Sequence, residues 1–159
     1  MKKIELTQGK FALVDDADYK YINQFKWCFK KDRNDKGYAV RKENGKITKM
    51  QFLILEKQDG LIIDHINMNG IDNRKENLRL CTKAENCQNR SIRKDSSSGY
   101  KGVFRTKNSK KNPWRARVTN NGKRINLGVF PSKKEASMAY NEKAKELFGD
   151  FAAINNLST

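Results

Sequence analysis

The sequence lacks long apolar runs and an apolar leader. A membrane span takes about 20 apolar residues, whereas the longest runs here, such as Phe52 to Leu55, have four. The first seven residues, Met1 to Thr7, contain no apolar segment of the kind found in secretory signals. We therefore expect neither an integral membrane protein nor a secreted one.

Cysteine and histidine are scarce. The three cysteines, Cys28, Cys81 and Cys87, form no C-x-x-C pair, which indicates reduced thiols in a cytoplasmic protein, or in the host cytoplasm or nucleoid if a phage encodes it. Structural zinc needs four ligands, usually in two close pairs, so zinc is disfavoured and the cysteines are predicted to be packing residues. His65 is the only histidine, so any histidine chemistry belongs there.

The shortage of acidic residues is the strongest compositional signal. The 159 residues, enough for one domain or two small ones, carry 34 Lys and Arg against 18 Asp and Glu, a net charge of +16. Between Asp95 and Glu135 there are eleven basic residues and no acidic one. This excess predicts a nucleic-acid partner. A solubility device or ribosome-like packing on RNA is the alternative, and a membrane surface is disfavoured because no long basic amphipathic helix is present.

A polar, Ser-rich stretch around residues 91–99 predicts a linker, with domains at 1–93 and 99–159 joined by 94–98. Before the linker, apolar patterning predicts strands at 11–14, 26–30, 38–41, 47–55 and 61–63, with a hairpin turn at 43–46. Two helices are also expected. One is a short helix within 16–25, and the other runs from Thr82 to about Arg90 and is opened by a Thr82–Glu85 capping box.

The residues around His65 suit phosphodiester hydrolysis. This reaction needs a base for the attacking water and a cation for the developing negative charge. A neutral His65 can be the base, since imidazole titrates near pH 6.5, and the side-chain carbonyl of Asn77 could orient its ring. Asp64 and Asn86 offer hard oxygen ligands that suit one Mg²⁺ or Mn²⁺ ion.

A purely structural interpretation of the same residues remains open. Asp64 could pair with Arg74 or Arg79, and Asn73 and Asn77 could be turn or capping residues. Consecutive strand residues point to opposite faces, so Asp64 and His65 must lie at a strand end or at a bend if both belong to one site.

Three sequence blocks follow one another in this region: Asp-His-Ile-Asn from Asp64, Asp-Asn-Arg-x-x-Asn-Leu-Arg from Asp72, and Glu-Asn-x-x-Asn from Glu85. Together they resemble the HNH endonucleases, most of all the His-Asn-Asn variant of phage and intron homing enzymes. The resemblance covers residues 1 to about 93. It implies a ββα-metal fold, with His65 and Asn77 as catalytic residues and Asp64 and Asn86 as metal ligands. Many relatives carry Met-His-Arg-Leu-Ile on the preceding hairpin, where this chain has Gln51 and Phe52 in place of the His and Arg.

The second half predicts a three-stranded antiparallel sheet packed on one helix. Strands are expected at 101–106, 114–119 and 124–130, with a hairpin turn at 120–123 and a helix over 132–148 opened by a Ser132–Glu135 capping box. Trp114 is either a base-stacking aromatic or a core anchor, and its alternation with Ala116 and Val118 favours the core.

Residues 99–155 resemble the ethylene-response-factor (APETALA-type) DNA-binding domain through Tyr100-Lys-Gly-Val103, Trp114-Arg-Ala116, Leu127-Gly-Val-Phe130, Glu135-Ala136, Ala139-Tyr140 and Phe148-Gly149. In that family the sheet reads the DNA major groove. The resemblance, together with the outward parity of the strand residues, gives the expected DNA contacts: Lys101, Arg105, Arg115, Arg117, Thr119, Arg124 and Asn126.

Together these features predict an α+β, monomeric, two-domain homing endonuclease. It would hydrolyse one strand of double-stranded DNA with one divalent metal ion and a histidine general base. The alternatives are a DNA-binding regulator whose HNH half is inactive, and an RNA- or ribosome-binding protein.

Overall fold

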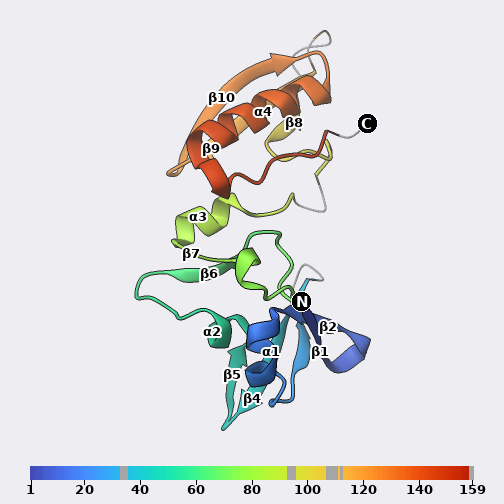
Figure 1. The fold of residues 1–159 in the computed structure, drawn as a ribbon. Helices are drawn as coiled ribbons and strands as arrows, with labels where there is room; N and C mark the ends of the chain where they lie inside the picture. The colour runs from blue at the N-terminus through green and yellow to red at the C-terminus, as the bar shows by residue number, and fades with distance from the viewer. Residues whose placement is uncertain (33–35, 93–95, 107–110, 112, 158–159) are drawn as a thin grey trace. The chain divides into compact units, whose positions relative to one another are not determined.

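The computed structural model describes residues 1–32, 36–92, 96–106, 111 and 113–157. Its chain has mixed α and β structure with small sheets and few helices, and it divides into two compact units, Met1–Lys83 and Ala84–Thr159 (Figure 1). The division falls earlier than the predicted linker, of which residues 94 and 95 lie outside the described residues. Among the described residues, none of the helices has the length and apolarity to cross a membrane.

The first unit begins with a two-stranded antiparallel sheet, β1 (Lys2–Glu5) and β2 (Phe11–Val14), joined by the 3-10 turn η1 (Thr7–Gly9) and followed by helix α1 (Asp16–Ile22). β2 and α1 agree with the sequence predictions, whereas β1 was not predicted. These elements and segments further along the chain form a buried core, which consists of Ile4, Leu6, Ala12, Val14, Ile22, Trp27, Ala39 and Met50.

A second sheet has the order β3 (Cys28–Lys31), β4 (Gly37–Glu43), β5 (Lys46–Lys49). The predicted hairpin turn is confirmed, with positive φ at Asn44 and Gly45. The strand predicted over 47–55 is wrong beyond Lys49, because residues Gln51–Ile54 form helix α2. Met50 explains the change: its side chain is fully buried, its N–H donates to the Ala39 carbonyl at 2.9 Å, and the chain then turns, with Leu53 N–H donating to Met50 O at 3.0 Å.

The third sheet of this unit pairs β6 (Ile62–His65) with β7 (Leu78–Cys81), joined by a long loop that ends in the 3-10 turn η2 (Lys75–Asn77). β6 agrees with the predicted strand and extends it to His65, while β7 was not predicted. Helix α3 (Lys83–Gln88) follows, close to the predicted helix, and nearly all of it belongs to the second unit.

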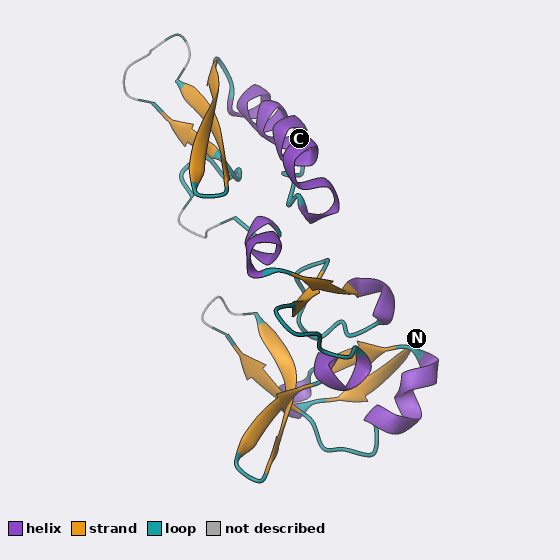
Figure 2. Ribbon diagram, turned by 90° about the vertical axis from the view of Figure 1, so that its left-hand side faces the viewer, coloured by secondary structure: helices purple, strands orange, loops and turns teal. Residues whose placement is uncertain are grey.

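The second unit contains an antiparallel sheet of order β10 (Lys123–Phe130), β9 (Trp114–Asn120), β8 (Val103–Arg105). Helix α4 (Lys133–Phe148), followed by the 3-10 turn η3 (Gly149–Phe151), covers one face of it (Figure 2). The Ser132 capping box is confirmed, since Glu135 N–H donates to Ser132 Oγ at 3.1 Å and Ser132 Oγ donates to Glu135 Oε1 at 2.8 Å.

The core of this unit lies between sheet and α4. Val103, Ala116, Val118, Ala136, Tyr140 and Ala144 are buried there. Trp114 packs against this core, so its interpretation as a core anchor is confirmed. Ser98, placed in the predicted linker, is instead buried, and its hydroxyl donates to the Val103 carbonyl at 2.8 Å.

Candidate functional site

The β6–β7 hairpin places the two predicted chemical residues at a strand end. In its antiparallel register Asp64 lies opposite Arg79 and His65 lies opposite Leu78. His65 is the last residue of β6, which is where the alternation of strand side chains requires it if both residues serve one site. Both side chains are buried.

Asn73 holds the imidazole ring of His65. Its side-chain oxygen lies 3.2 Å from His65 Nε2. An amide oxygen only accepts, so Nε2 carries the proton in this arrangement, and Nδ1 is the nitrogen of the neutral ring that can take up another. The ring also packs against Tyr38 of β4, with ring centroids 6.0 Å apart.

The surroundings of His65 favour the neutral ring. Burial lowers the pKa of His65 below its ordinary value of 6.5, while the Asn73 hydrogen bond and the charges of Asp64 and Asp72 oppose this shift. At neutral pH the imidazole is therefore unprotonated at one nitrogen. This is the form that a general base requires.

Asp64 is oriented by Arg79. The guanidinium donates to Asp64 Oδ2 from Nε at 3.2 Å and from Nη2 at 3.0 Å. Of the two pairings that the sequence allowed for Asp64, the structure has the one with Arg79. The ion pair is compatible with a ligand role, because it fixes the carboxylate direction while a carboxylate offers about four lone-pair positions.

Hydrogen bonds within the loop between β6 and β7 fix its shape. Arg74 donates to both oxygens of Asp72, at 2.8 and 2.7 Å, and holds the pKa of that carboxyl below its usual value. Asn67 Nδ2 donates to Asp72 Oδ2 at 2.8 Å. The Asn77 side chain donates to the Asp72 carbonyl at 2.7 Å and accepts from Asn67 N–H at 2.9 Å.

The contact expected of Asn77 is therefore made by Asn73. Asn77 shapes the loop, as the structural interpretation of the sequence allowed, while Asn73 touches the histidine. The spacing from His65 did not distinguish the two asparagines. The signal that could have found Asn73 is the Asp72-Asn73-Arg74 run, in which the flanking residues form the ion pair that holds the loop.

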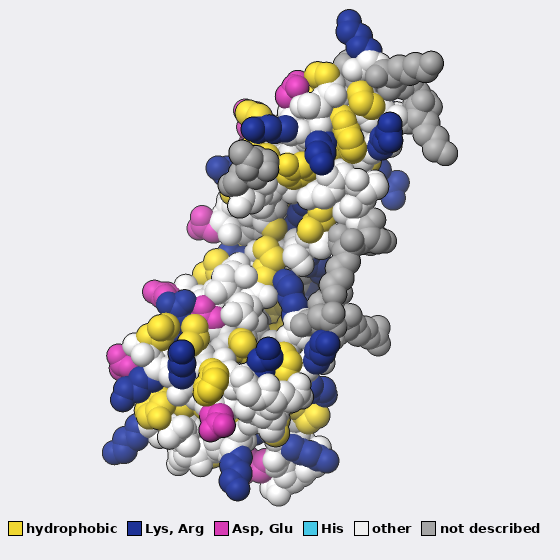
Figure 3. Space-filling view, turned by 90° about the vertical axis from the view of Figure 1, so that its right-hand side faces the viewer, with side chains coloured by type: hydrophobic (Ala, Val, Ile, Leu, Met, Phe, Trp, Pro, Cys, Tyr) yellow, Lys and Arg dark blue, Asp and Glu magenta, His cyan; other side chains and the backbone are white. Residues whose placement is uncertain are grey.

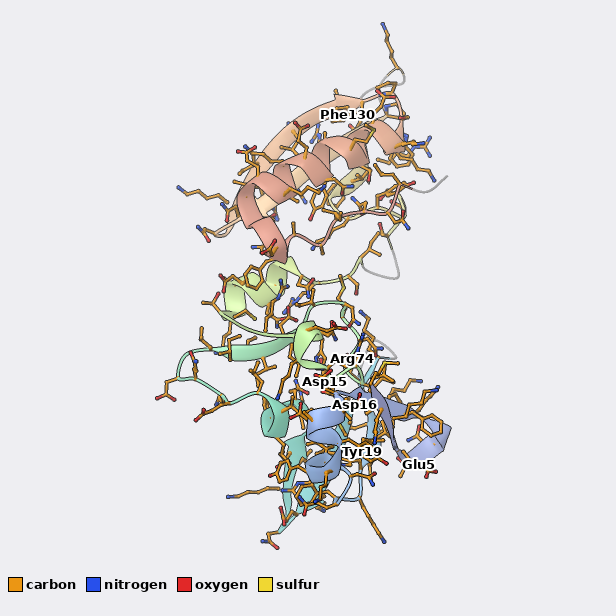
Figure 4. The ribbon with its side chains drawn as sticks, viewed as in Figure 1. Glu5, Asp15, Asp16, Tyr19, Arg74 and Phe130 are labelled. Carbon is orange, nitrogen blue, oxygen red and sulfur yellow. The ribbon has the colours of Figure 1, made fainter. Side chains whose placement is uncertain are left out.

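The loop is also attached to β2 and α1. Leu13 N–H donates to the Ile71 carbonyl and Asn73 N–H donates to the Leu13 carbonyl, both at 2.8 Å. Lys75 N–H donates to Asp15 Oδ2 at 2.7 Å, just before α1, and Figure 4 shows Asp15 together with Arg74 in this region. The N-terminal elements thus fix the backbone position from which Asn73 reaches His65.

Gly70 gives this loop its close approach to β4. A Cβ atom at Gly70 would lie 2.5 Å from the Gly37 carbonyl oxygen and 2.6 Å from Tyr38 Cδ1. We expect Gly70→Ala to lower the free energy of unfolding by about 1–3 kcal/mol, as overpacking does. Thermal melting checks this, with the exposed Asp59→Ala as control; an unchanged melting temperature for Gly70→Ala would contradict the close packing.

The donor chemistry suits a hard cation. Among the described residues, no group of three or more His, Cys, Asp and Glu side chains could hold a metal ion. Asp64 offers a carboxylate and Asn86, on α3, an amide oxygen, and these are ligands that Mg²⁺ and Mn²⁺ accept together with water. Asn86 belongs to the second unit, so its part in the site stays a prediction. Cys81 is buried as predicted for a packing residue, whereas Cys28 and Cys87 are exposed, contrary to that prediction.

The sheet of the second unit has a cationic face opposite α4. Arg115 pairs in register with Phe104 and Val129, Arg117 with Asn126, and Thr119 with Arg124. These positions alternate with the buried Ala116 and Val118, as the sequence predicted. The Arg117 guanidinium lies 4.7 Å from the Phe104 ring centroid. Arg105 is exposed at the end of β8.

Lys101 differs from the other predicted DNA contacts. Its ammonium donates to the carbonyls of Gln88, at 2.5 Å, and Arg90, at 2.9 Å, and burial lowers its pKa to about 8. The ammonium is thus held by the backbone at the end of α3. This explains why α3 groups with the second unit.

Comparison with known proteins assigns the family. The HNH endonuclease profile matches residues 55–88, which span β6, the loop, β7 and α3. The uncharacterized HNH endonuclease L560 of Acanthamoeba polyphaga mimivirus is 34% identical over 155 residues, covering 94% of this chain and 77% of that protein. Protein 3.8 of Escherichia phage T7 is 34% identical over 93 residues, covering 58% and 74%. No solved structure matches the chain. The chain therefore belongs to the HNH endonuclease family.

Proposed function

We propose that the protein is a metal-dependent DNA endonuclease of the homing type that nicks one strand. Residues 1–93 form the catalytic domain in a ββα-metal arrangement, and residues 99–159 form an APETALA-type domain that holds the duplex. The family membership supports DNA cleavage. The strand, loop and helix order around His65 supports the catalytic assignment.

His65 is the general base of this reaction. Nδ1 accepts a proton from water, the water oxygen bonds to phosphorus, and the bond between phosphorus and the leaving sugar oxygen breaks. The leaving oxygen takes its proton from solvent. Asn73 keeps Nε2 as the protonated nitrogen and fixes the ring plane, which is a positioning role.

One Mg²⁺ or Mn²⁺ ion, held by Asp64 and Asn86, would neutralise negative charge on the phosphate and the leaving oxygen. Arg79 keeps the Asp64 carboxylate in place through its paired hydrogen bonds. The rest of the site is built by loop contacts that need no metal, among them the Asp72–Arg74 ion pair.

The second unit supplies DNA affinity. Its outer sheet face carries Arg115, Arg117 and Arg124 and is free of α4, and a sheet with cationic side chains can enter the major groove. Lys and Arg side chains are spread over the face that Figure 3 draws. We leave Lys101 out of the contact set because its ammonium binds the end of α3.

The observation that carries the proposal is the environment of His65. The only histidine of the chain is buried, bonded to Asn73 and kept neutral, inside the segment that the HNH profile matches. A histidine with only a packing role would not need the Asn-rich loop, which is attached to β2 and to the start of α1 by hydrogen bonds and packs closely against β4.

Removing the metal ion is expected to abolish cleavage. Supercoiled plasmid incubated with the protein should be cut with Mg²⁺ or Mn²⁺ and stay intact in EDTA, because the cation supplies the charge that stabilises the developing negative charge on the phosphate and the leaving oxygen. Gel electrophoresis of the plasmid checks this. Binding without cleavage in every metal would instead favour the regulator with an inactive HNH half, for which Gln51 in place of the relatives' histidine is the motivating observation.

A further inference from the structure

The Tyr38 ring lies next to both a lysine and the histidine of the candidate site. In the β4–β5 register Lys49 pairs with Val40, which makes it a diagonal neighbour of Tyr38 on the same face. The Lys49 ammonium lies 3.9 Å from the centroid of the Tyr38 ring. The other neighbour of that ring is His65, at 6.0 Å between centroids. The phenol ring is thus a neighbour of both the ammonium and the imidazole.

Lys49 is a partly buried cation beside the candidate site. Its side chain is half-buried, and this burial lowers its pKa, an effect that Asp32 opposes. The charge of Lys49 reaches the site, since it contributes to lowering the pKa of His65. No ion pair among the described residues includes Lys49, whereas Arg79 is paired with Asp64 and Arg74 with Asp72.

An ammonium that is partly withdrawn from water and has no carboxylate partner is stabilised by an anionic ligand. At a nuclease site the anion at hand is a substrate phosphate. Neither Gln51, which is buried and neutral, nor Phe52, which is apolar, offers a cation where relatives carry a His-Arg pair. Lys49 directly precedes them.

We propose that Lys49 binds a non-bridging oxygen of the scissile phosphate beside His65. The proposal rests on the proposed nuclease function and adds a catalytic residue to it. The Tyr38 ring supports the ammonium through a cation–π contact. Gly70 allows the loop to close against that ring, so the same packing sets the positions of Lys49 and His65.

The test compares Lys49→Met, which keeps the length and removes the charge, with Lys49→Arg, which keeps the charge. Lys46→Met is the matched control, because Lys46 is exposed on the same strand and alternates to its other face. Single-turnover nicking of supercoiled plasmid with Mg²⁺ should fall about 10²-fold in Lys49→Met, as it does when one donor to a developing oxyanion is removed. Lys49→Arg should recover most of the rate, and Lys46→Met should match the wild type.

A second measurement does not depend on cleavage. Binding of a short DNA duplex in EDTA, measured over a range of salt concentrations, should lose about one unit of salt slope in Lys49→Met and none in Lys49→Arg. Melting temperatures establish that the variants fold. If the wild type nicks no plasmid, the proposed function fails while the slope still decides the phosphate contact. The proposal would be overturned if Lys49→Met nicked DNA at the wild-type rate, or if Lys49→Met and Lys49→Arg lost the same amount of rate. An unchanged salt slope in Lys49→Met would overturn it as well.

Discussion

Replacing His65 by alanine is expected to lower the rate of DNA nicking about 10²–10⁴-fold, the usual cost of removing a general base. The affinity for duplex DNA should stay the same, because the side chain is buried and contributes no charge at neutral pH. Single-turnover nicking of supercoiled plasmid gives the rate, and binding in EDTA gives the affinity.

Asn73→Ala is the graded comparison for this prediction. Its rate should fall less than that of His65→Ala, because Asn73 orients the ring and does not take up the proton. Asn77→Ala should cost activity through the loop, since its side chain bonds to the backbone of Asn67 and Asp72 there, and should lower the melting temperature as well. Full activity in His65→Ala would remove the histidine from the mechanism.

The second large effect concerns salt. A fragment of residues 84–159 is expected to bind duplex DNA alone, with affinity falling steeply as salt rises. If about five of its basic residues neutralise phosphates, the logarithm of affinity falls with that of salt at a slope of about −4 to −5, or about 300- to 1000-fold between 50 and 200 mM. Fluorescence anisotropy of a labelled duplex measures this.

The matched variants for the salt prediction lie on opposite sides of the second unit. Arg117→Gln, on the outer sheet face, should reduce the slope by about one, whereas Lys145→Gln, on α4, should leave it unchanged. A salt-insensitive affinity would contradict the phosphate contacts. Tighter binding to RNA hairpins than to any duplex would favour the RNA-binding alternative.

Local patterns in the sequence were sufficient for much of the fold. Alternation predicted the strand at 114–119, Asn-Gly pairs predicted both hairpin turns, and the Ser132–Glu135 box predicted the start of α4. These features depend on neighbours a few residues apart. β7 was missed because Leu78–Cys81 carries no alternating burial and is defined by its distant partner β6.

The site was less predictable than the fold around it. The three motif blocks in order predicted roles for His65, the only histidine, and for Asp64, and both roles stay predictions. The choice between Asn73 and Asn77 depends on the path of the loop, which is set by backbone bonds from Leu13, about 60 residues earlier in the chain. The strand predicted beyond Lys49 failed for a similar reason, because burial of Met50 bends the chain into α2.

The domain boundary also depended on a contact between distant residues. A Ser-rich stretch predicted a linker up to Ser98, yet Ser98 is buried and bonded to the Val103 carbonyl. Lys101 bonds to the carbonyls at the end of α3 and joins that helix to the second unit. A serine and a lysine in a polar segment are predicted to be exposed, because the local sequence does not reveal the backbone carbonyls to which they donate.

The central claim is a single metal-dependent active site per chain, which cuts one strand. Its most direct test is a time course of supercoiled plasmid with Mg²⁺ at limiting protein concentration. One site on a monomer predicts that open circles accumulate first and persist, at a rate proportional to protein concentration. Linear product appearing directly, at a rate that rises with the square of the concentration, would show that two chains act together and would contradict the account.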